Sequence, residues 1–149
     1  MNQKLLWLLT VLFLVTSTFA HAQQPKKMPR VGYLTANTSS AELPRLDAFR
    51  QALHDLGHVD GQNIVIEYRH AEGKFERLPG FAAELVGLKV DLLVGVTTNA
   101  VVAAKNATRT IPIVFIGVSD PIAAGLADSL ARPGGNLTGF TNIAPVLSG

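Results

Sequence analysis

Short apolar segments alternate with longer amphipathic segments along most of this chain. The short segments are rich in Val, Ile and Leu, as buried strands are, and they predict strands at 31–34, 64–68, 90–96, 113–118 and 137–140. The longer segments have helical spacing of apolar or small residues, and they predict helices at 46–56, 78–88, 99–107 and 123–131. Strict alternation of strands and helices predicts one α/β domain with a doubly wound, mostly parallel sheet, whose first strand we expect to be central.

The fourth predicted strand differs from the others because it is apolar on both faces. Its run from Val114 to Val118 stops abruptly at Ser119 and Asp120. A strand of this kind is typical of the centre of a parallel sheet that is covered by helices on each side. Ligands of such sheets bind beyond the carboxyl ends of the strands, so this pattern places the functional site at that edge.

The first residues read as an export signal and not as part of the fold. Lys4 precedes an apolar run from Leu5 to Val15, in which Thr10 is the one polar residue, and Ala20-His21-Ala22 follows as a typical cleavage pattern. The run is too short to cross a membrane, and a buried N-terminal helix is the other interpretation. We expect a signal peptide at 1–22, a polar linker broken by proline at 23–29, and a folded domain at 30–149.

Composition narrows the class of protein further. The chain has no cysteine, so it has neither a disulfide nor a thiol that could carry a lipid, and we expect a soluble protein in the periplasm. The formal net charge is +2, and no concentrated basic face is visible, which argues against nucleic acid as a partner. The last residues follow directly on the fifth strand, and we expect the sequence to be a fragment.

Polar residues follow each predicted strand, and parallel geometry would collect them on one edge of the sheet. Hydroxyls, amides and the N–H groups of helix N-termini suit a small polar or anionic ligand group. The other interpretation is that these residues only cap the helices that follow them. Their coincidence on one edge favours binding, and the candidate ligand-binding residues are Thr35, Asn37, Ser39, Thr97, Thr98, Asn99, Ser119 and Asp120.

The sharpest local candidate is the sequence Thr97-Thr98-Asn99. Asn99 is a good cap for a helix with a small-residue face, and the preceding hydroxyls and first-turn amides suit a carboxylate. Asp120 is the counterpart for an ammonium group, so the two together would suit a zwitterion such as an amino acid. An equal alternative for Asp120 is a helix cap followed by Pro121.

Motifs for catalysis or for a cofactor are missing from the sequence. Gly32-Tyr33-Leu34-Thr35 stands where a dinucleotide fingerprint would begin, and there is neither a phosphate-binding loop nor a nucleophile elbow. His54 and His58 are four residues apart, but no third ligand is evident, so solvated histidines are expected. The sequence therefore predicts no enzyme, no cofactor and no metal site.

Several segments resemble the first lobe of the periplasmic substrate-binding proteins of ABC importers, in the family associated with tryptophan and tyrosine uptake. These segments are 45–53, 56–64, 67–69, 71–79, 110–121 and 132–139. The resemblance implies a type I periplasmic-binding-protein-like lobe at 30–149, a second lobe that is missing here, and no catalysis. It also implies a small-molecule ligand, such as an aromatic amino acid, that is held between two lobes and delivered to an ABC permease in the inner membrane.

By the same resemblance, the polar loops form the first lobe's half of the ligand cleft. A second hypothesis is an exported α/β lobe that senses a ligand or belongs to an enzyme, because fold does not fix function.

Overall fold

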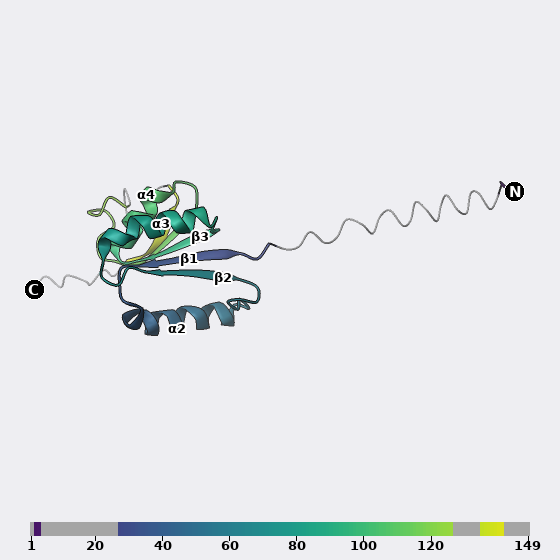
Figure 1. The fold of residues 1–149 in the computed structure, drawn as a ribbon, viewed down its shortest axis with the longest axis horizontal. Coiled ribbons are helices and arrows are strands. Elements are labelled where there is room, and N and C mark those ends of the chain that lie inside the picture. The colour runs from purple at the N-terminus through teal and green to yellow at the C-terminus, as the bar shows by residue number, and fades with distance from the viewer. Residues whose placement is uncertain (1, 4–26, 127–134, 142–149) are drawn as a thin grey trace, which may run out of the picture.

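Five parallel strands form the sheet of this protein, and helices cover both of its faces (Figure 1). The computed structural model describes residues 2–3, 27–126 and 135–141. In chain order its elements are β1 (Arg30–Thr35), α2 (Ser39–Asp55), β2 (Val65–His70), the short 3-10 helix η1 (Phe75–Arg77), α3 (Leu78–Gly87), β3 (Leu92–Val96), α4 (Thr98–Ala107), β4 (Ile113–Val118) and β5 (Leu137–Thr141). The predicted doubly wound α/β class is confirmed.

The strand order is β2-β1-β3-β4-β5, so the middle strand is β3. The expectation that the first strand would be central is therefore wrong in detail: β1 is an inner strand, hydrogen-bonded to β2 on one side and to β3 on the other. Each helix returns the chain to the start of the sheet, and α2 lies on one face while α3 and α4 lie on the other (Figure 1). All carboxyl ends therefore share one edge, as predicted.

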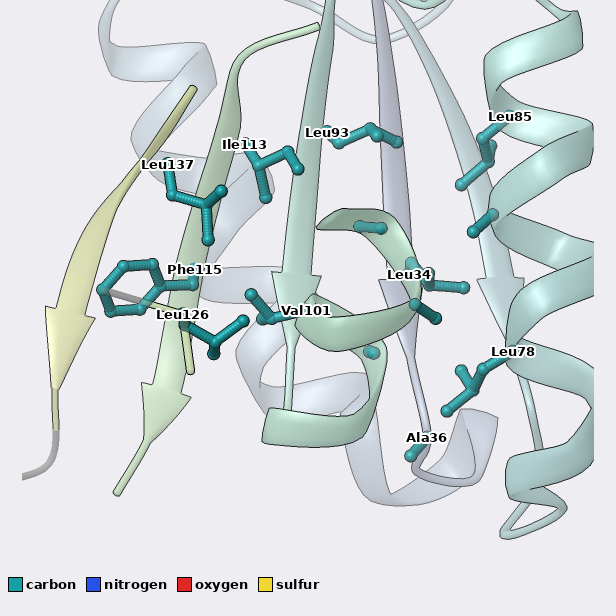
Figure 2. Close-up of a cluster of buried hydrophobic side chains, with 14 of the residues drawn as sticks. Leu34, Ala36, Leu78, Leu85, Leu93, Val101, Ile113, Phe115, Leu126 and Leu137 are labelled. Carbon is teal, nitrogen blue, oxygen red and sulfur yellow. The ribbon is translucent and has the colours of Figure 1, made fainter. Parts of the chain in front are cut away.

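The face below α3 and α4 holds the larger apolar core (Figure 2). Ala100, Ala103 and Ala104 of α4 are buried there, which confirms the small-residue face expected for this helix. Gly95 of β3 makes the close approach possible: a Cβ at this position would lie 2.7 Å from Cγ2 of Val101. The packing of α4 on β3 thus requires a residue without a side chain.

The face of the sheet that α2 covers holds a smaller core, which Leu46 forms with residues of β1, β2 and β3. The apolar stripe that predicts helix α2 includes Leu56, which is one position too far. Leu56 is the C-cap of α2 and is 75% exposed. The predicted stop at Gly57 is confirmed, since Gly57 has a φ of 84° that ends the helix. The helix begins earlier than its apolar stripe, at Ser39, behind the N-cap Thr38.

Strand β4 is buried on one face only, contrary to the prediction. Ile113, Phe115 and Val118 are buried against the α3 and α4 side, whereas Val114 and Ile116 are half-buried. The reason is that α2, the helix of the described residues on that face, packs over β1, β2 and β3. Of the helix predicted at 123–131, the structure describes residues 123–126 only, which belong to turns and a bend, and the rest of the predicted helix lies outside the described residues.

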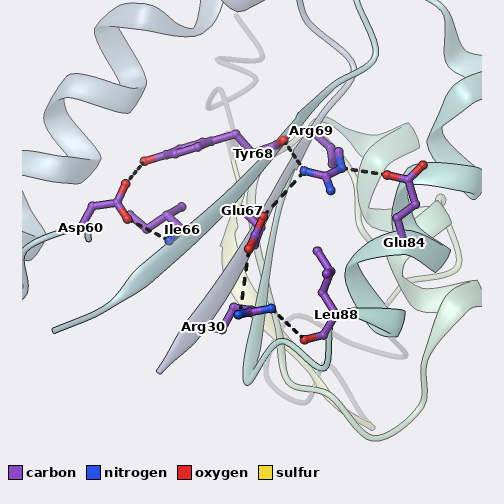
Figure 3. Close-up of polar contacts among 8 residues, drawn as sticks. All are labelled: Arg30, Asp60, Ile66, Glu67, Tyr68, Arg69, Glu84 and Leu88. Carbon is purple, nitrogen blue, oxygen red and sulfur yellow. Dashed lines mark hydrogen bonds and ion pairs between the residues drawn. The ribbon is translucent and has the colours of Figure 1, made fainter. Parts of the chain in front are cut away.

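Charged side chains cover the edge strand β2 (Figure 3). Arg69 Nε bonds Glu84 Oε2 at 2.9 Å, which ties β2 to α3, and Glu67 lies between Arg69 and Arg30 with both N–O distances at 3.9 Å. On the other face, Arg50 Nε donates to the Tyr68 hydroxyl at 2.9 Å. Charge along an edge strand discourages pairing with another chain, and here it also anchors the strand that leads into the candidate site.

Candidate functional site

The candidate site lies where β1 and β3 end next to each other. Thr35 at the end of β1 is in register with Val96 at the end of β3. After β1 the chain turns to α2 on one face, and after β3 it turns to α4 on the opposite face (Figure 1). In folds of this kind, the usual ligand position is the carboxyl edge of the sheet, at the point where neighbouring connections diverge to opposite faces. We call this part of the edge, between the ends of β1 and β3, the proposed crevice. The candidate residues Thr35, Asn37 and Ser39 lie on the β1 side of this position, and Thr97, Thr98 and Asn99 lie on the β3 side.

On the β1 side, most of the predicted polar groups already have partners within the protein. Thr35 is fully buried, and its hydroxyl accepts a hydrogen bond from Asn37 N at 3.2 Å. Ser39 donates its backbone N–H to Glu72 Oε1 at 2.9 Å, and its hydroxyl bonds the same oxygen. Glu72 has a φ of 55° in the loop after β2. The loops after β1 and β2 are therefore joined into one block.

The group that the sequence did not reveal on this side is Glu42, whose carboxylate is completely buried. It accepts hydrogen bonds from Asn37 Nδ2 at 2.6 Å, from the Tyr33 hydroxyl at 2.8 Å and from Arg45 Nη1 at 2.5 Å. Burial by itself would raise the pKa of Glu42, but these three donors outweigh it and leave that pKa below its ordinary value. A signal existed: Glu42 lies four residues before Leu46, on its apolar stripe.

On the β3 side, the backbone of Thr97 is strained. Its φ of 85° and ψ of 147° form a combination that β-branched residues rarely adopt. The Thr97 Oγ1 atom is buried and has no hydrogen-bond partner in the described part of the chain. Strain and an unpartnered buried hydroxyl on one residue are typical of functional positions, because neither stabilises the fold.

Helix α4 begins one residue before the predicted cap. Thr97 occupies the N-cap position and Thr98 is the first helical residue, so Asn99 lies in the first turn and is exposed. The expectation that Asn99 caps this helix is therefore wrong. No side chain caps α4, which leaves its first N–H groups without an intrahelical partner and concentrates positive potential at the crevice.

His70 is a second residue that sequence reasoning did not single out as a candidate. It ends β2 in register with Thr35, and its ring centroid lies 6.5 Å from that of Tyr33. Its Nδ1 atom is buried and has no partner among the described residues. The carboxyl ends of three adjacent strands thus bring His70, Thr35 and Thr97 to one edge.

Ser119 and Asp120 follow β4, the strand beyond β3, and both are exposed. Asp120 Oδ1 accepts hydrogen bonds from Ile122 N at 3.0 Å and from Ala123 N at 2.9 Å. These two bonds from backbone N–H groups are the geometry expected if Asp120 is a cap. A role for Ser119 or Asp120 in binding remains a prediction.

A cavity of about 470 Å³ lies elsewhere, against the outer part of α2. Leu53 and Ile66 contribute its apolar wall, and His54 and His58 lie on its rim. Within the described ranges, no group of three or more His, Asp or Glu residues is placed to hold a metal ion. We assign the candidate site to the carboxyl edge, because unpartnered buried polar atoms gather there.

None of the helices in the described ranges has the combination of length and apolar character that a membrane crossing requires.

Comparison with known proteins identifies the family of this chain. Residues 39–148 match the family described as ABC transporter substrate binding protein, and the chain belongs to that family. It is 38% identical over 121 residues to a tyrosine-binding protein of Clostridioides difficile strain R20291. The aligned segment covers 78% of this chain and 34% of the relative.

Solved structures show the same fold. A ligand-free, open substrate-binding protein with adhesive properties from Clostridium difficile has a TM-score of 0.75 at 33% identity, over 79% of this chain and 40% of its own. A conserved domain protein of Vibrio cholerae has a TM-score of 0.71 at 36% identity, and the match covers 80% of this chain and 40% of the other. An ABC domain from Streptococcus pneumoniae, solved in complex with L-Trp, has a TM-score of 0.70 at 28% identity, and the match covers 76% of this chain and 38% of the other. The chain therefore spans well under half the length of these relatives.

Proposed function

We propose that this chain forms the first lobe of the solute-binding component of an ABC importer. The observation that carries the proposal is the pair of polar atoms at the carboxyl edge, His70 Nδ1 at the end of β2 and Thr97 Oγ1 after β3, which are buried without partners in the described part of the chain. Buried polar atoms without partners cost free energy, and a bound ligand would supply the missing hydrogen bonds. Membership of the substrate-binding family supports a binding role for this chain.

The ligand is an aromatic amino acid. The relatives support this choice, because one is named a tyrosine-binding protein and another was solved with L-Trp. The chemistry of the crevice agrees, since the uncapped N-terminus of α4 with Thr98 and Asn99 suits a carboxylate. A second lobe would close over the ligand and contribute the remaining contacts, because binding sites of this kind enclose most of the ligand surface.

The cellular role follows from the family and from the N-terminal sequence. We infer export by the signal peptide at 1–22, release into the periplasm with the linker 23–29, and delivery of the ligand to an ABC permease of the inner membrane. Residues 1–22 lie almost wholly outside the described ranges, so their role rests on the sequence. The protein has no catalytic role in this scheme. The alternative, a sensing or enzyme lobe of the same fold, ranks second because the relatives are named as binding proteins.

Calorimetry on the protein produced from its whole reading frame tests this proposal. Against the twenty amino acids, we expect tyrosine or tryptophan to bind tightest and Thr97→Val, which removes the buried hydroxyl, to weaken that binding at least tenfold. Asp47→Asn is the matched control, because Asp47 lies on the exposed side of α2, away from the crevice. If no amino acid binds, the ligand class is wrong. If Thr97→Val binds like the parent, the crevice is not the site.

A further inference from the structure

The buried carboxylate of Glu42 sets the orientation of a neighbouring amide. An ionised carboxylate only accepts hydrogen bonds, so each group that touches it must present a donor. Asn37 touches Glu42 Oε1 at 2.6 Å and must therefore present its Nδ2. The opposite orientation would place Asn37 Oδ1 against a carboxylate oxygen, where two acceptors repel each other. The hydrogen bonds to Glu42 therefore decide which atom of the Asn37 amide is Nδ2 and which is Oδ1, since the two atoms have nearly the same shape.

The other end of the same amide faces away from Glu42. Asn37 is half-buried, and its backbone N–H is held by the Thr35 hydroxyl at 3.2 Å, so the residue is fixed at both its main chain and its side chain. No described residue donates a hydrogen bond to Asn37 Oδ1. The loop between β1 and α2 thus offers one oriented acceptor at the carboxyl edge of the sheet.

The charges around this acceptor cancel within the protein. Arg45 Nη1 bonds the same Glu42 oxygen at 2.5 Å, so the buried negative charge is paired. The N-terminus of α2, which would otherwise attract an anion, is occupied by Glu72 through the N–H of Ser39. At the end of β4, Asp120 Oδ1 is engaged by two backbone N–H groups. The β1 side of the crevice therefore favours a donor group, while the α4 side favours an anion.

We propose that Asn37 Oδ1 accepts a hydrogen bond from the ammonium group of the ligand, and that Glu42 is the positioning residue that gives Asn37 this polarity. The inference rests on the proposed function, because it assigns one end of an amino acid to one side of the proposed crevice. The ligand then lies with its ammonium group toward β1 and its carboxylate toward α4. Glu42 acts only through Asn37.

A ligand that lacks the ammonium group separates this role from a structural one. We would measure the affinities of the whole-reading-frame protein for L-tyrosine or L-tryptophan, whichever binds tighter, and for the corresponding aryl propionate. Asn37→Ala should lower the affinity for the amino acid about tenfold or more, the scale of one hydrogen bond to a charged group, and leave the affinity for the propionate within about twofold. A general distortion of the crevice would weaken both ligands alike.

Two further variants complete the test. Glu42→Gln should show the same selective loss, because a glutamine can donate to Asn37 and let its amide turn round. Asn99→Ala is the matched control on the carboxylate side and should weaken both ligands equally. If Asn37→Ala fails to fold, Asn37→Ser is measured in its place.

Equal losses for both ligands in the Asn37 variant would overturn the assignment of the ammonium group while leaving the proposed function intact. If neither L-tyrosine nor L-tryptophan binds the parent protein, the proposed ligand class is wrong and this inference fails with it.

Discussion

The N-termini of α2 and α4 have similar sequences but differ in capping, because a side chain caps α2 and none of the described side chains caps α4. Thr38 precedes α2 in an ordinary extended conformation, and its hydroxyl accepts from Ala41 N at 3.3 Å. Thr97 precedes α4 at a φ of 85°, and its hydroxyl accepts nothing from the described residues. Glu72 adds a carboxylate to the start of α2, whereas α4 receives no side-chain cap.

This contrast separates a structural helix start, at α2, from the helix start of α4, which we propose to be part of the binding site. A capped helix start with satisfied donors stabilises the fold by about 1 kcal/mol and leaves little for a ligand. An uncapped start with a strained residue costs free energy in the empty protein, and a ligand can recover that cost when it binds. The loop from β1 into α2 therefore acts as a rigid wall of the proposed site. The loop from β3 into α4 holds the polar groups that have no hydrogen-bond partner among the described residues.

The largest effect should come from removing the carboxylate that organises the wall. Glu42→Ala leaves Tyr33, Asn37 and Arg45 without their common acceptor and opens a void, so we expect a loss of about 2–4 kcal/mol in the free energy of unfolding. Urea denaturation followed by circular dichroism measures it. Glu76→Ala, at an exposed glutamate of η1, should change this free energy by less than about 0.5 kcal/mol. Equal values for the two variants would show that the buried network does not stabilise the wall.

A somewhat smaller loss should follow when α4 is pushed away from the sheet. In Gly95→Ala the new methyl group would meet Val101 Cγ2 at 2.7 Å and Val101 Cα at 3.2 Å. We expect destabilisation of about 1–3 kcal/mol and weaker ligand binding, because the start of α4 shifts with Val101. Gly87→Ala is the control, since a Cβ there meets nothing within 4 Å. A stable Gly95→Ala protein with unchanged affinity would refute the link between this contact and the site.

The strain at Thr97 predicts a trade between stability and binding. Thr97→Gly should raise the free energy of unfolding by about 1 kcal/mol, because glycine adopts a φ of 85° without strain and this gain exceeds its greater freedom in the unfolded chain. The same variant should bind the ligand more weakly, since it lacks the buried hydroxyl. Thr97→Ser keeps the hydroxyl and should retain most of the affinity. Thermal melts and calorimetry on the three proteins check both effects, and a destabilised glycine variant would mean that the backbone is not strained.

The smallest effect concerns the contact between Glu72 and Ser39. Hydrogen bonds from the Ser39 hydroxyl and backbone lower the pKa of Glu72. A lowered folded pKa means that this contact is complete above the ordinary value of 4.5 and is lost as the pH falls through the lower folded value. The amide proton of Ser39 should therefore titrate in NMR spectra with a midpoint below 4.5. Glu72→Gln should abolish that titration while leaving the melting temperature nearly unchanged, and persistence of the titration would assign it to another group.

Much of the architecture was predictable because it depends on local periodicity. The helical spacing of Leu46 and Leu53 and the β-branched runs of the strands report which face is buried, whatever the partner is. Parallel connectivity then placed the polar loops on one edge, including Thr35 and Thr97. The order of the strands in the sheet could not be predicted as well, because the alternation of strands and helices does not specify which strand is in the middle.

By itself, the amino-acid sequence determined the α/β class, the strands, the apolar faces of the helices and the edge at which polar loops gather. Only the tertiary structure decided which of those polar groups are already occupied. Ser39 meets Glu72 across 33 positions of the chain, and Glu42 is buried because Tyr33 and Asn37 converge on it. Propensity and periodicity act between near neighbours, whereas hydrogen-bond satisfaction depends on which distant segments meet. That the buried Thr97 Oγ1 and His70 Nδ1 have no partner among the described residues is for that reason a property of the folded chain alone.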